Sequence, residues 1–242
     1  MPSQETRYPV AAWSLGARLF HWINFLCILG LLALGLLILN SKAFGIAGPA
    51  KLLLKEVHVW FGYVFVTNLL FRLLLAFLGP VSARWRAFLP VRGGAAYLGQ
   101  LLRGRAPSYG GHNPAGRIAV TLLLLSMLTQ AATGLVLAGT DLYQGPLGGY
   151  MAEWASGGDE AIRARLVPGD AATAHPEGWK AMRAFREPIE ATHLYNFYVL
   201  LSLILLHIAG VVFAETRLQE GLVSAMFTGR KLLRAPPVDR TG

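Results

Sequence analysis

Residues 192–210 read THLYNFYVLLSLILLHIAG, a stretch long and apolar enough to cross a bilayer. A helix needs about twenty apolar residues to span the roughly 30 Å of hydrocarbon in a membrane. The stretch nevertheless carries two ionisable side chains, His193 and His207. Ionisable residues are costly inside a membrane helix, and they usually face the interior of the bundle, where they serve a function. The two histidines are therefore the first candidates for a functional site.

The other apolar residues of the chain also come in blocks. Of the 242 residues, 54% are hydrophobic and 14% are charged, whereas charged residues make up about a quarter of a typical soluble domain. Blocks of spanning length cover residues 17–39, 57–78, 116–138 and 193–214. None of them shows the strict alternation of a barrel strand. The sequence predicts one all-α domain over residues 1–242, an integral membrane four-helix bundle.

The first block is expected to be a retained span. It is longer than the core of a cleaved signal peptide, about 7–15 residues, and no small-residue cleavage site follows it. The single cysteine, Cys27, lies inside this block. One cysteine excludes an intrachain disulfide, and it excludes a covalently attached c-type haem, which needs a Cys-x-x-Cys-His motif.

Charge predicts the orientation of the chain. Four spans place both termini on the same side, and the loops, tails and span ends carry thirteen basic residues on that side against eight on the other. By the positive-inside rule, both termini are expected in the cytoplasm, which makes this a multi-pass protein of the bacterial inner membrane. The net charge of +9 is then a matter of topology and lipid contact, and no nucleic-acid partner is expected.

Three segments outside the spans carry further expectations. The outer loop 139–191 is unusually long, since loops beyond about 15 residues are usually functional or disordered; we expect an ordered cap with short helices and a docking face for a periplasmic partner. Its five basic and eight acidic residues give a net charge of −3. The polar, proline-rich tail from about 233 to 242 is expected to be disordered. Asn113 and Pro114 suit the cap and first residue of the third span.

Four histidines lie inside the apolar spans, and they fall at two depths. The first span runs outward, so His21 lies near the cytoplasm; the second and fourth run inward, so His58 and His193 lie near the outer surface. His207 is about 21 Å further in than His193, and both point to nearly the same side of the helix, about 40° apart. A pair from two helices at each level could clamp a flat macrocycle, and neutral imidazole is a good axial ligand for haem iron. The pattern favours two non-covalent, bis-histidine haem b groups between the helices.

The fourteen-residue interval between His193 and His207 recurs in the other spans. Fourteen residues after His21 stands Gly35, which would leave room for the outer haem. Fourteen residues after His58 stands Arg72, whose charge would suit the propionates of the inner haem. Further small residues that would let a ring approach closely are Gly62, Gly134 and Gly210.

Other functions of the histidines remain open at this point. A lone histidine in a membrane helix is often a hydrogen-bond partner of a neighbouring helix, but four at two matched depths are harder to explain in that way. A proton relay or metal transporter should carry acids beside the histidines at mid-membrane, whereas Glu56 and Glu215 lie at span ends. Zinc prefers a compact tetrahedral cluster over two pairs about 20 Å apart.

Several motifs together resemble the bacterial cytochrome b561 family. They are RLFHW (18–22), EVHVWFGY (56–63), GHNPAGR (111–117), QAATGL (130–135), the opening stretch, and GLVSAMFTGRK (221–231). Within the family, the chain most resembles the di-haem cytochrome b subunits of nickel–iron hydrogenases and related membrane-anchored dehydrogenases. The resemblance, over roughly residues 15–232, implies two stacked b haems and a quinone site. It also implies the ligands: His21 with His207 for the inner haem, His58 with His193 for the outer.

The expected function is that of an electron conduit. A periplasmic hydrogenase, dehydrogenase or cytochrome c would dock at the outer loop and exchange electrons with the outer haem, and the inner haem would exchange them with a membrane quinone. The chain would then be the electron-transfer subunit of a quinone-linked oxidoreductase, with no catalytic residue of its own. Quinone reduction needs a proton donor, for which the candidates are His112, Asn113 and Arg117. The alternative is that these residues only begin a helix with a basic flank.

Two other functions are weighed against the conduit. A stand-alone oxidoreductase that passes electrons from superoxide to quinone would need a basic outer funnel to attract the anion, and the net charge of −3 on the outer loop argues mildly against it. A non-redox transporter would contain no haem. His175, in the outer loop, is expected to be an ordinary loop residue.

Overall fold

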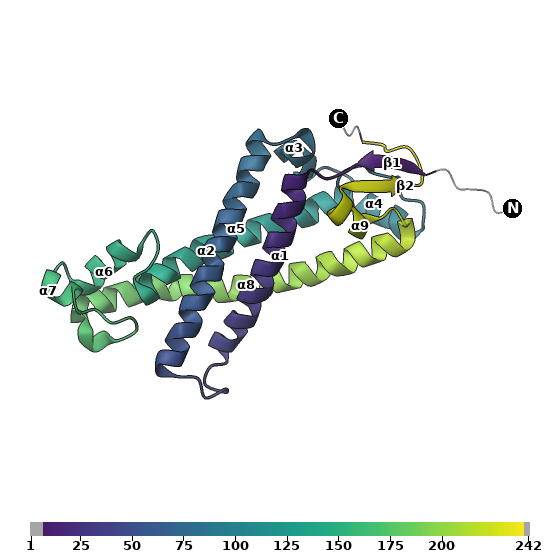
Figure 1. The fold of residues 1–242 in the computed structure, drawn as a ribbon. Helices are drawn as coiled ribbons and strands as arrows, with labels where there is room; N and C mark the ends of the chain where they lie inside the picture. Colours follow the sequence, from purple (N-terminus) through teal and green to yellow (C-terminus); the bar gives the residue numbers. More distant parts are fainter. Residues whose placement is uncertain (1–6, 240–242) are drawn as a thin grey trace. The chain divides into compact units, whose positions relative to one another are not determined.

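A computed structural model of the chain describes residues 7–239. Four long helices dominate it: α1 (Leu15–Leu39), α2 (Gly48–Leu78), α5 (Pro114–Leu142) and α8 (Pro176–Leu218), labelled in Figure 1. Each is long and apolar enough to cross a membrane. The predicted helical class is therefore confirmed for the described part of the chain, and its four long helices are candidates for the predicted spans.

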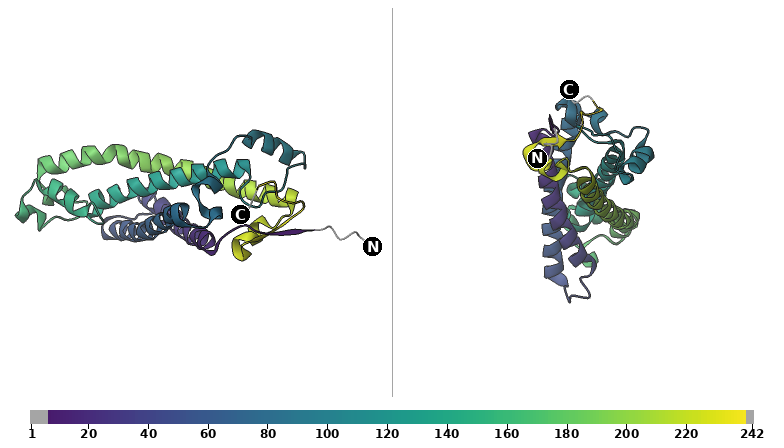
Figure 2. Two further views of the ribbon diagram at one scale, coloured as in Figure 1. Left: turned by 90° about the horizontal axis from the view of Figure 1, so that it is seen from above. Right: turned by 90° about the vertical axis from the view of Figure 1, so that its right-hand side faces the viewer.

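Two of these helices extend well beyond their apolar blocks. α2 begins at Gly48, followed by Pro49, and α8 begins at Pro176. Proline is tolerated in the first turn of a helix because the N–H that it lacks would have no intrahelical partner there. α8 also continues through Pro188; the hydroxyl of Thr192 donates to the Pro188 carbonyl at 2.8 Å. The left view in Figure 2 shows α8 as one continuous helix. Hydropathy marked only the apolar part of each helix.

The segment between α5 and α8 forms the expected ordered cap of short helices. It contains α6 (Gly148–Ser156), α7 (Glu160–Arg163) and a 3-10 turn at Ala171–Thr173. A small core of Met151, Ala155 and Met182 joins the cap to the first turns of α8. Gly178 is required there, since a Cβ at this position would lie 2.3 Å from the carbonyl oxygen of Trp154.

Short elements also fill the connection between α2 and α5. They are a 3-10 turn at Val81–Ala83, α3 (Trp85–Phe88) and α4 (Gly94–Leu102). α5 then begins at Pro114 as predicted. The side-chain oxygen of Asn113 accepts a hydrogen bond from the backbone N–H of Gly116 at 2.7 Å, which confirms Asn113 as the N-cap.

The two ends of the described chain pair with each other. After α8 come α9 (Leu222–Thr228) and β2 (Arg230–Leu233). β2 pairs antiparallel with β1 (Tyr8–Ala11) at the start of the chain, with Tyr8 opposite Leu233. The two strands lie alongside each other in Figure 1. Nothing in the hydropathy pattern indicated this pairing, because each strand has only four residues.

The expectation of a disordered tail is wrong for residues 233–239. Leu233 is completely buried, and the backbone N–H of Val238 donates to the carbonyl of Ser108 at 3.0 Å. The carboxylate of Asp239 accepts from the backbone N–H groups of Gly110 and Gly111 at 2.7 and 3.0 Å. The last residues of that expected tail, 240–242, lie outside the described residues.

The chain divides into two compact units, named here by one histidine of each. The His21 unit comprises Met1–Phe25, Thr67–Leu125 and Leu200–Gly242; the His58 unit comprises Leu26–Val66 and Ser126–Val199. Each unit contains a part of all four long helices. Each also contains two of the four intramembrane histidines.

Candidate functional site

His21 and His207 both belong to the His21 unit. They come from α1 and α8, and they are close enough to interact electrostatically. Nδ1 of His21 is buried and has no hydrogen-bond partner among residues 7–239. The His21 ring meets the Trp22 ring edge-on, with 5.2 Å between centroids, and the Trp22 indole donates to the Met226 carbonyl at 2.9 Å. No side-chain hydrogen bond to Nδ1 fixes how the His21 ring is turned.

His58 and His193 both belong to the His58 unit. They come from α2 and α8 and also interact electrostatically. Nδ1 of His58, like that of His21, is buried without a hydrogen-bond partner in the described part of the chain. The pairing expected from helix direction and depth thus recurs within each unit: one histidine of α8 lies with one histidine of α1 or α2.

His193, by contrast, is held at both ring nitrogens. The hydroxyl of Thr133 lies 2.8 Å from Nδ1, and the side-chain nitrogen of Gln130 lies 3.0 Å from Nε2. The Gln130 oxygen accepts from the Asn196 amide at 2.6 Å. That amide also donates to the backbone carbonyl of Ser126 at 2.9 Å, which fixes its orientation. Four polar side chains or backbone groups of α5 and α8 therefore orient one imidazole.

These partners determine which nitrogen of His193 carries the proton. The Thr133 hydroxyl has one hydrogen, which it donates to the backbone carbonyls of Thr129 and Gln130 at 2.8 and 3.2 Å. It must therefore accept from His193, so the proton is on Nδ1. The Gln130 amide nitrogen then donates to the lone pair of Nε2. Metal-bound histidines commonly donate their other ring N–H in this way, which fixes the tautomer and the direction of the ring.

Two of the four candidate glycines lie against histidine rings of the same unit. A Cβ at Gly134 would lie 3.3 Å from Cε1 of His193, and a Cβ at Gly35 would lie 3.5 Å from Cε1 of His58. A Cβ at Gly62 would meet no other atom within 4 Å. Gly134 and Gly35 thus leave space beside the imidazoles, while Gly62 borders open space.

Arg72 belongs to the same unit as His21 and His207 and is only 8% exposed. Its guanidinium donates to the Ala83 carbonyl at 2.9 Å and lies 4.3 Å from the centre of the Phe88 ring. These contacts hold the charge of Arg72 in place and partly satisfy its donors. The structure gives it no acidic partner within residues 7–239.

The three quinone candidates differ in how far the protein already uses them. The Asn113 side chain caps α5, and Arg117 donates to the Arg86 carbonyl at 2.8 Å. His112 packs on the Trp13 ring, with 4.5 Å between centroids, and its Nδ1 is buried without a partner among the described residues. Burial and the charge of Lys231 lower the pKa of His112 to about 3. His112 is therefore a neutral ring with a free polar atom.

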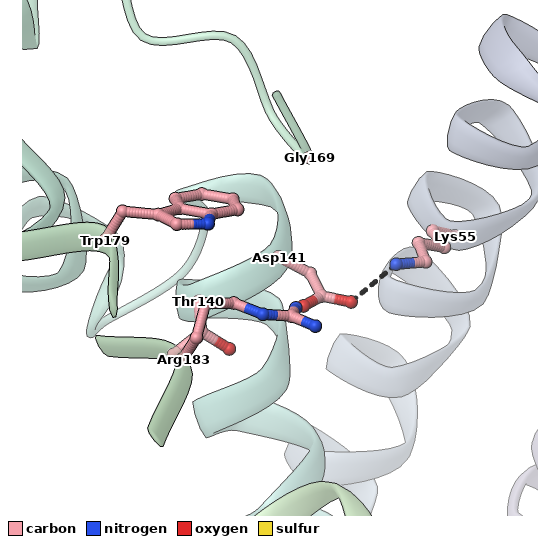
Figure 3. Close-up of a pocket in the computed structure, with 6 residues that line it drawn as sticks. All are labelled: Lys55, Thr140, Asp141, Gly169, Trp179 and Arg183. Carbon is pink, nitrogen blue, oxygen red and sulfur yellow. Dashed lines mark hydrogen bonds and ion pairs between the residues drawn. The ribbon is translucent and has the colours of Figure 1, made fainter. Parts of the chain in front are cut away.

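An ionic network in the His58 unit was not expected from the sequence. Asp141 on α5 pairs with Lys55 on α2 at 2.6 Å, and with Arg186 on α8 through both carboxylate oxygens. Arg186 pairs in turn with Glu190, one helical turn further along α8. Figure 3 shows the Lys55–Asp141 pair. The signal in the sequence was a set of charges just before His58 and His193, but a single sequence does not reveal which of them meet.

The chain matches the prokaryotic cytochrome b561 family over residues 12–229. It belongs to that family. It is also 24% identical, over 94% of its own length and 91% of the other protein, to a probable Ni/Fe-hydrogenase B-type cytochrome subunit of Rhizobium leguminosarum bv. viciae. No solved structure matches the chain. The predicted family is thus confirmed: this is a transmembrane b-type cytochrome of electron transport.

The histidines of this cytochrome fit haem b, the group that the family implies. Nδ1 of His21 and Nδ1 of His58 have no hydrogen-bond partner within residues 7–239. The Nε2 lone pair of His193 accepts a hydrogen bond from Gln130 at 3.0 Å, so it would be open to iron only after that amide moved away. Gly35 and Gly134 keep Cβ atoms away from the rings. The same residues hold no group of three or more His, Cys, Asp or Glu side chains that could bind a metal ion.

Proposed function

We propose that this cytochrome holds two haem b groups, one between His21 and His207 and one between His58 and His193. Electrons pass through them between a periplasmic redox partner and the quinone pool. The observation that carries the proposal is the division of the four histidines: each compact unit has one pair, drawn from two helices. Bound haem b supplies one-electron redox chemistry, and the protein supplies binding, orientation and electrostatics.

The residues around the histidines have distinct tasks in this proposal. Thr133 would accept a hydrogen bond from Nδ1–H of His193 and so leave Nε2 as the nitrogen that could bind iron, in the place where Gln130 now donates. Arg72 contributes a fixed positive charge in the His21 unit, which favours the electron-rich reduced state of the inner haem. A charge that stabilises reduction at one haem sets the thermodynamic direction of electron flow.

The partner outside is proposed to be a hydrogenase-like or dehydrogenase protein that docks at the cap, residues 139–191. Two observations support this: the relative from Rhizobium leguminosarum bv. viciae is named as a cytochrome subunit of a hydrogenase, and the cap is built of ordered helices around its own small core. The cytochrome would then be the membrane subunit of a quinone-linked oxidoreductase, with both termini in the cytoplasm of a bacterial cell. Reporter fusions to the C-terminus test that orientation.

For the quinone, the proposal rests on His112 more than on Asn113 or Arg117. Asn113 and Arg117 are engaged with the backbone, whereas the buried Nδ1 of His112 is an acceptor without a hydrogen-bond partner within residues 7–239. The test is quinol-dependent haem reduction in membranes with His112→Leu against wild type. Unchanged reduction would remove His112 from the quinone site.

The decisive experiment is the optical spectrum of the purified full-length protein, with haem counted per chain. We expect split b-type bands in the reduced-minus-oxidised spectrum and two haems per chain. Absence of b-type bands from the purified protein would refute the two-haem proposal and favour the transporter. His58→Ala and His193→Ala should each leave one haem, and two haems in either variant would refute the pairing. Superoxide-driven reduction without any partner would favour the stand-alone oxidoreductase.

A further inference from the structure

A pocket of about 230 Å³ lies in the His58 unit, beside the ionic network. Figure 3 shows that its wall combines two cationic side chains with an indole ring, a hydroxyl and one carboxylate. The residues that line it are Lys55, Thr140, Asp141, Gly169, Trp179 and Arg183. The proposed electron path uses none of them.

The charges around this pocket do not cancel. Arg186 holds Asp141 through both carboxylate oxygens and also pairs with Glu190. Lys55 contacts Asp141 as well, through one oxygen. Arg183 lies 5.9 Å from the Trp179 ring centre and has no acidic partner within residues 7–239. Three cations therefore face two acids, which leaves one positive charge for a ligand.

Helix periodicity aligns the pocket with the His58–His193 pair. Arg186 precedes His193 by seven residues, which is nearly two turns and about 10.5 Å, so both lie on the same face of α8. Asp141 follows Gly134, the glycine against His193, by the same interval on α5. Lys55 precedes His58 by about one turn. The faces that carry the imidazoles thus carry the ionic network one to two turns further out; of its members named here, Lys55 and Asp141 line the pocket, and Arg186 lies beside it.

We infer that this pocket binds a carboxylate, and that the carboxylate is a propionate of the haem held by His58 and His193. The inference rests on the proposed function. A haem b carries two propionates, and a carboxylate at the edge of a membrane bundle needs cations and hydrogen-bond donors, because its desolvation is costly. Arg183 offers a planar guanidinium that suits a carboxylate, Lys55 offers a mobile point charge, and the Thr140 hydroxyl is a donor.

The first test is a redox titration of the purified protein with the double variant Lys55→Gln/Arg183→Gln. Loss of both cations disfavours the electron-rich reduced state, so the midpoint potential of one of the two b haems should fall. A tenfold change in its reduction equilibrium is expected, equal to about 59 mV for one electron. The other haem should keep its potential. Arg165→Gln, which removes an exposed outer arginine that does not line the pocket, is the matched control and should change neither.

Variants that keep the charge separate this role from a merely structural one. Lys55→Arg/Arg183→Lys should retain both haems and both potentials. Selective loss of one haem in the glutamine variant, restored by the charge-conserving one, would also support the inference. Two unchanged potentials in the glutamine variant would overturn it, and would point to an acidic side chain of a docking protein. If the wild type itself lacks two b haems, the proposed function fails first.

A second test changes the ligand in place of the protein. Full-length chain produced in a haem-deficient host is loaded with haem b or with its dimethyl ester, which lacks the carboxylate charge. The ester should bind the outer site of the wild type about tenfold more weakly than haem b, and the glutamine variant should not distinguish the two. Equal discrimination by both proteins would overturn the inference.

Discussion

The two units hold their histidines in different surroundings. In the His58 unit, polar side chains of α5 and α8 orient His193 at both ring nitrogens, and a charged network lies beyond it. In the His21 unit, Nδ1 of His21 is buried without a partner in the described chain, and the ring rests against Trp22. His193 is thus preorganised by hydrogen bonds, whereas the His21 ring is held by packing. We expect the His21 imidazole to turn more freely than that of His193 until a ligand holds it.

The largest effect is expected from double histidine variants, which test directly whether each unit holds its own haem. If each unit holds one haem, His21→Ala/His207→Ala should lose one haem per chain, the same loss as either single variant. His21→Ala/His58→Ala should lose both, because it removes one ligand from each unit. Haem per chain, from a pyridine haemochrome assay on purified protein, measures this. Loss of both haems in the first variant would mean that the pairs cross between units.

Asp141→Ala should destabilise the His58 unit by about 2–4 kcal/mol. It leaves Lys55 and the nearly buried Arg186 without their common carboxylate, and an unpaired buried charge is expensive. The matched control is Glu153→Ala. It breaks an exposed pair with Arg163, whose side chains are 50% and 47% exposed, and should cost less than about 1 kcal/mol. Thermal unfolding in detergent compares the two, and equal losses would show that the network contributes no more than a surface pair.

Thr133→Val tests the hydrogen bond that distinguishes His193. An acceptor at Nδ1 raises the basicity of the imidazole and so favours oxidised iron; without it, the potential of the outer haem should rise by up to about 60 mV, a tenfold change in the equilibrium. Nδ1 of His21 has no such partner within residues 7–239, and the haem proposed between His21 and His207 should keep its potential. A shift in both haems, or in neither, would contradict the assignment.

The smallest expected effect is on the pH dependence of folding stability, through His112 in the His21 unit. Burial and the charge of Lys231 lower the pKa of His112 to about 3, and the Arg72 and Arg117 charges act in the same sense, against a hydrogen bond to the Ala87 carbonyl. The unfolded chain therefore binds more protons than the folded one below about pH 6.5, so folding stability falls as the pH falls through that range.

His112→Gln should reduce this pH dependence. Between pH 7 and 5 the melting temperature of the wild type should decline, and that of the variant should decline less. This window lies above the ordinary pKa values of Glu and Asp, so carboxylates contribute little to the slope. Identical slopes in the two proteins would show that His112 is already charged in the folded state or is exposed.

Much of the architecture follows from the sequence because it depends on local composition. An apolar block of about twenty residues is long enough to span a bilayer. It can do so as a helix because every backbone N–H and C=O group is then hydrogen-bonded within the segment. The N-cap of α5 at Asn113 is also local, because its side chain bonds to the backbone N–H of Gly116, three residues later. The depths of the four histidines follow from the direction of each helix and its rise per residue. Whether they bind haem is a question for the spectra and variants above.

Only the tertiary structure decided which distant groups meet. The pairing of β1 with β2, the burial of Leu233 and the orientation of His193 by Thr133 and Gln130 each join residues far apart in the chain. So does the meeting of Asp141 with Lys55 and Arg186. The segments that contain these residues have the composition of ordinary loops and helix ends. Which partner each residue meets depends on how the helices and strands pack together. The sequence by itself determined the helices and the positions of the histidines along them, because both follow from local composition and periodicity. Packing alone decided which side chains surround each histidine.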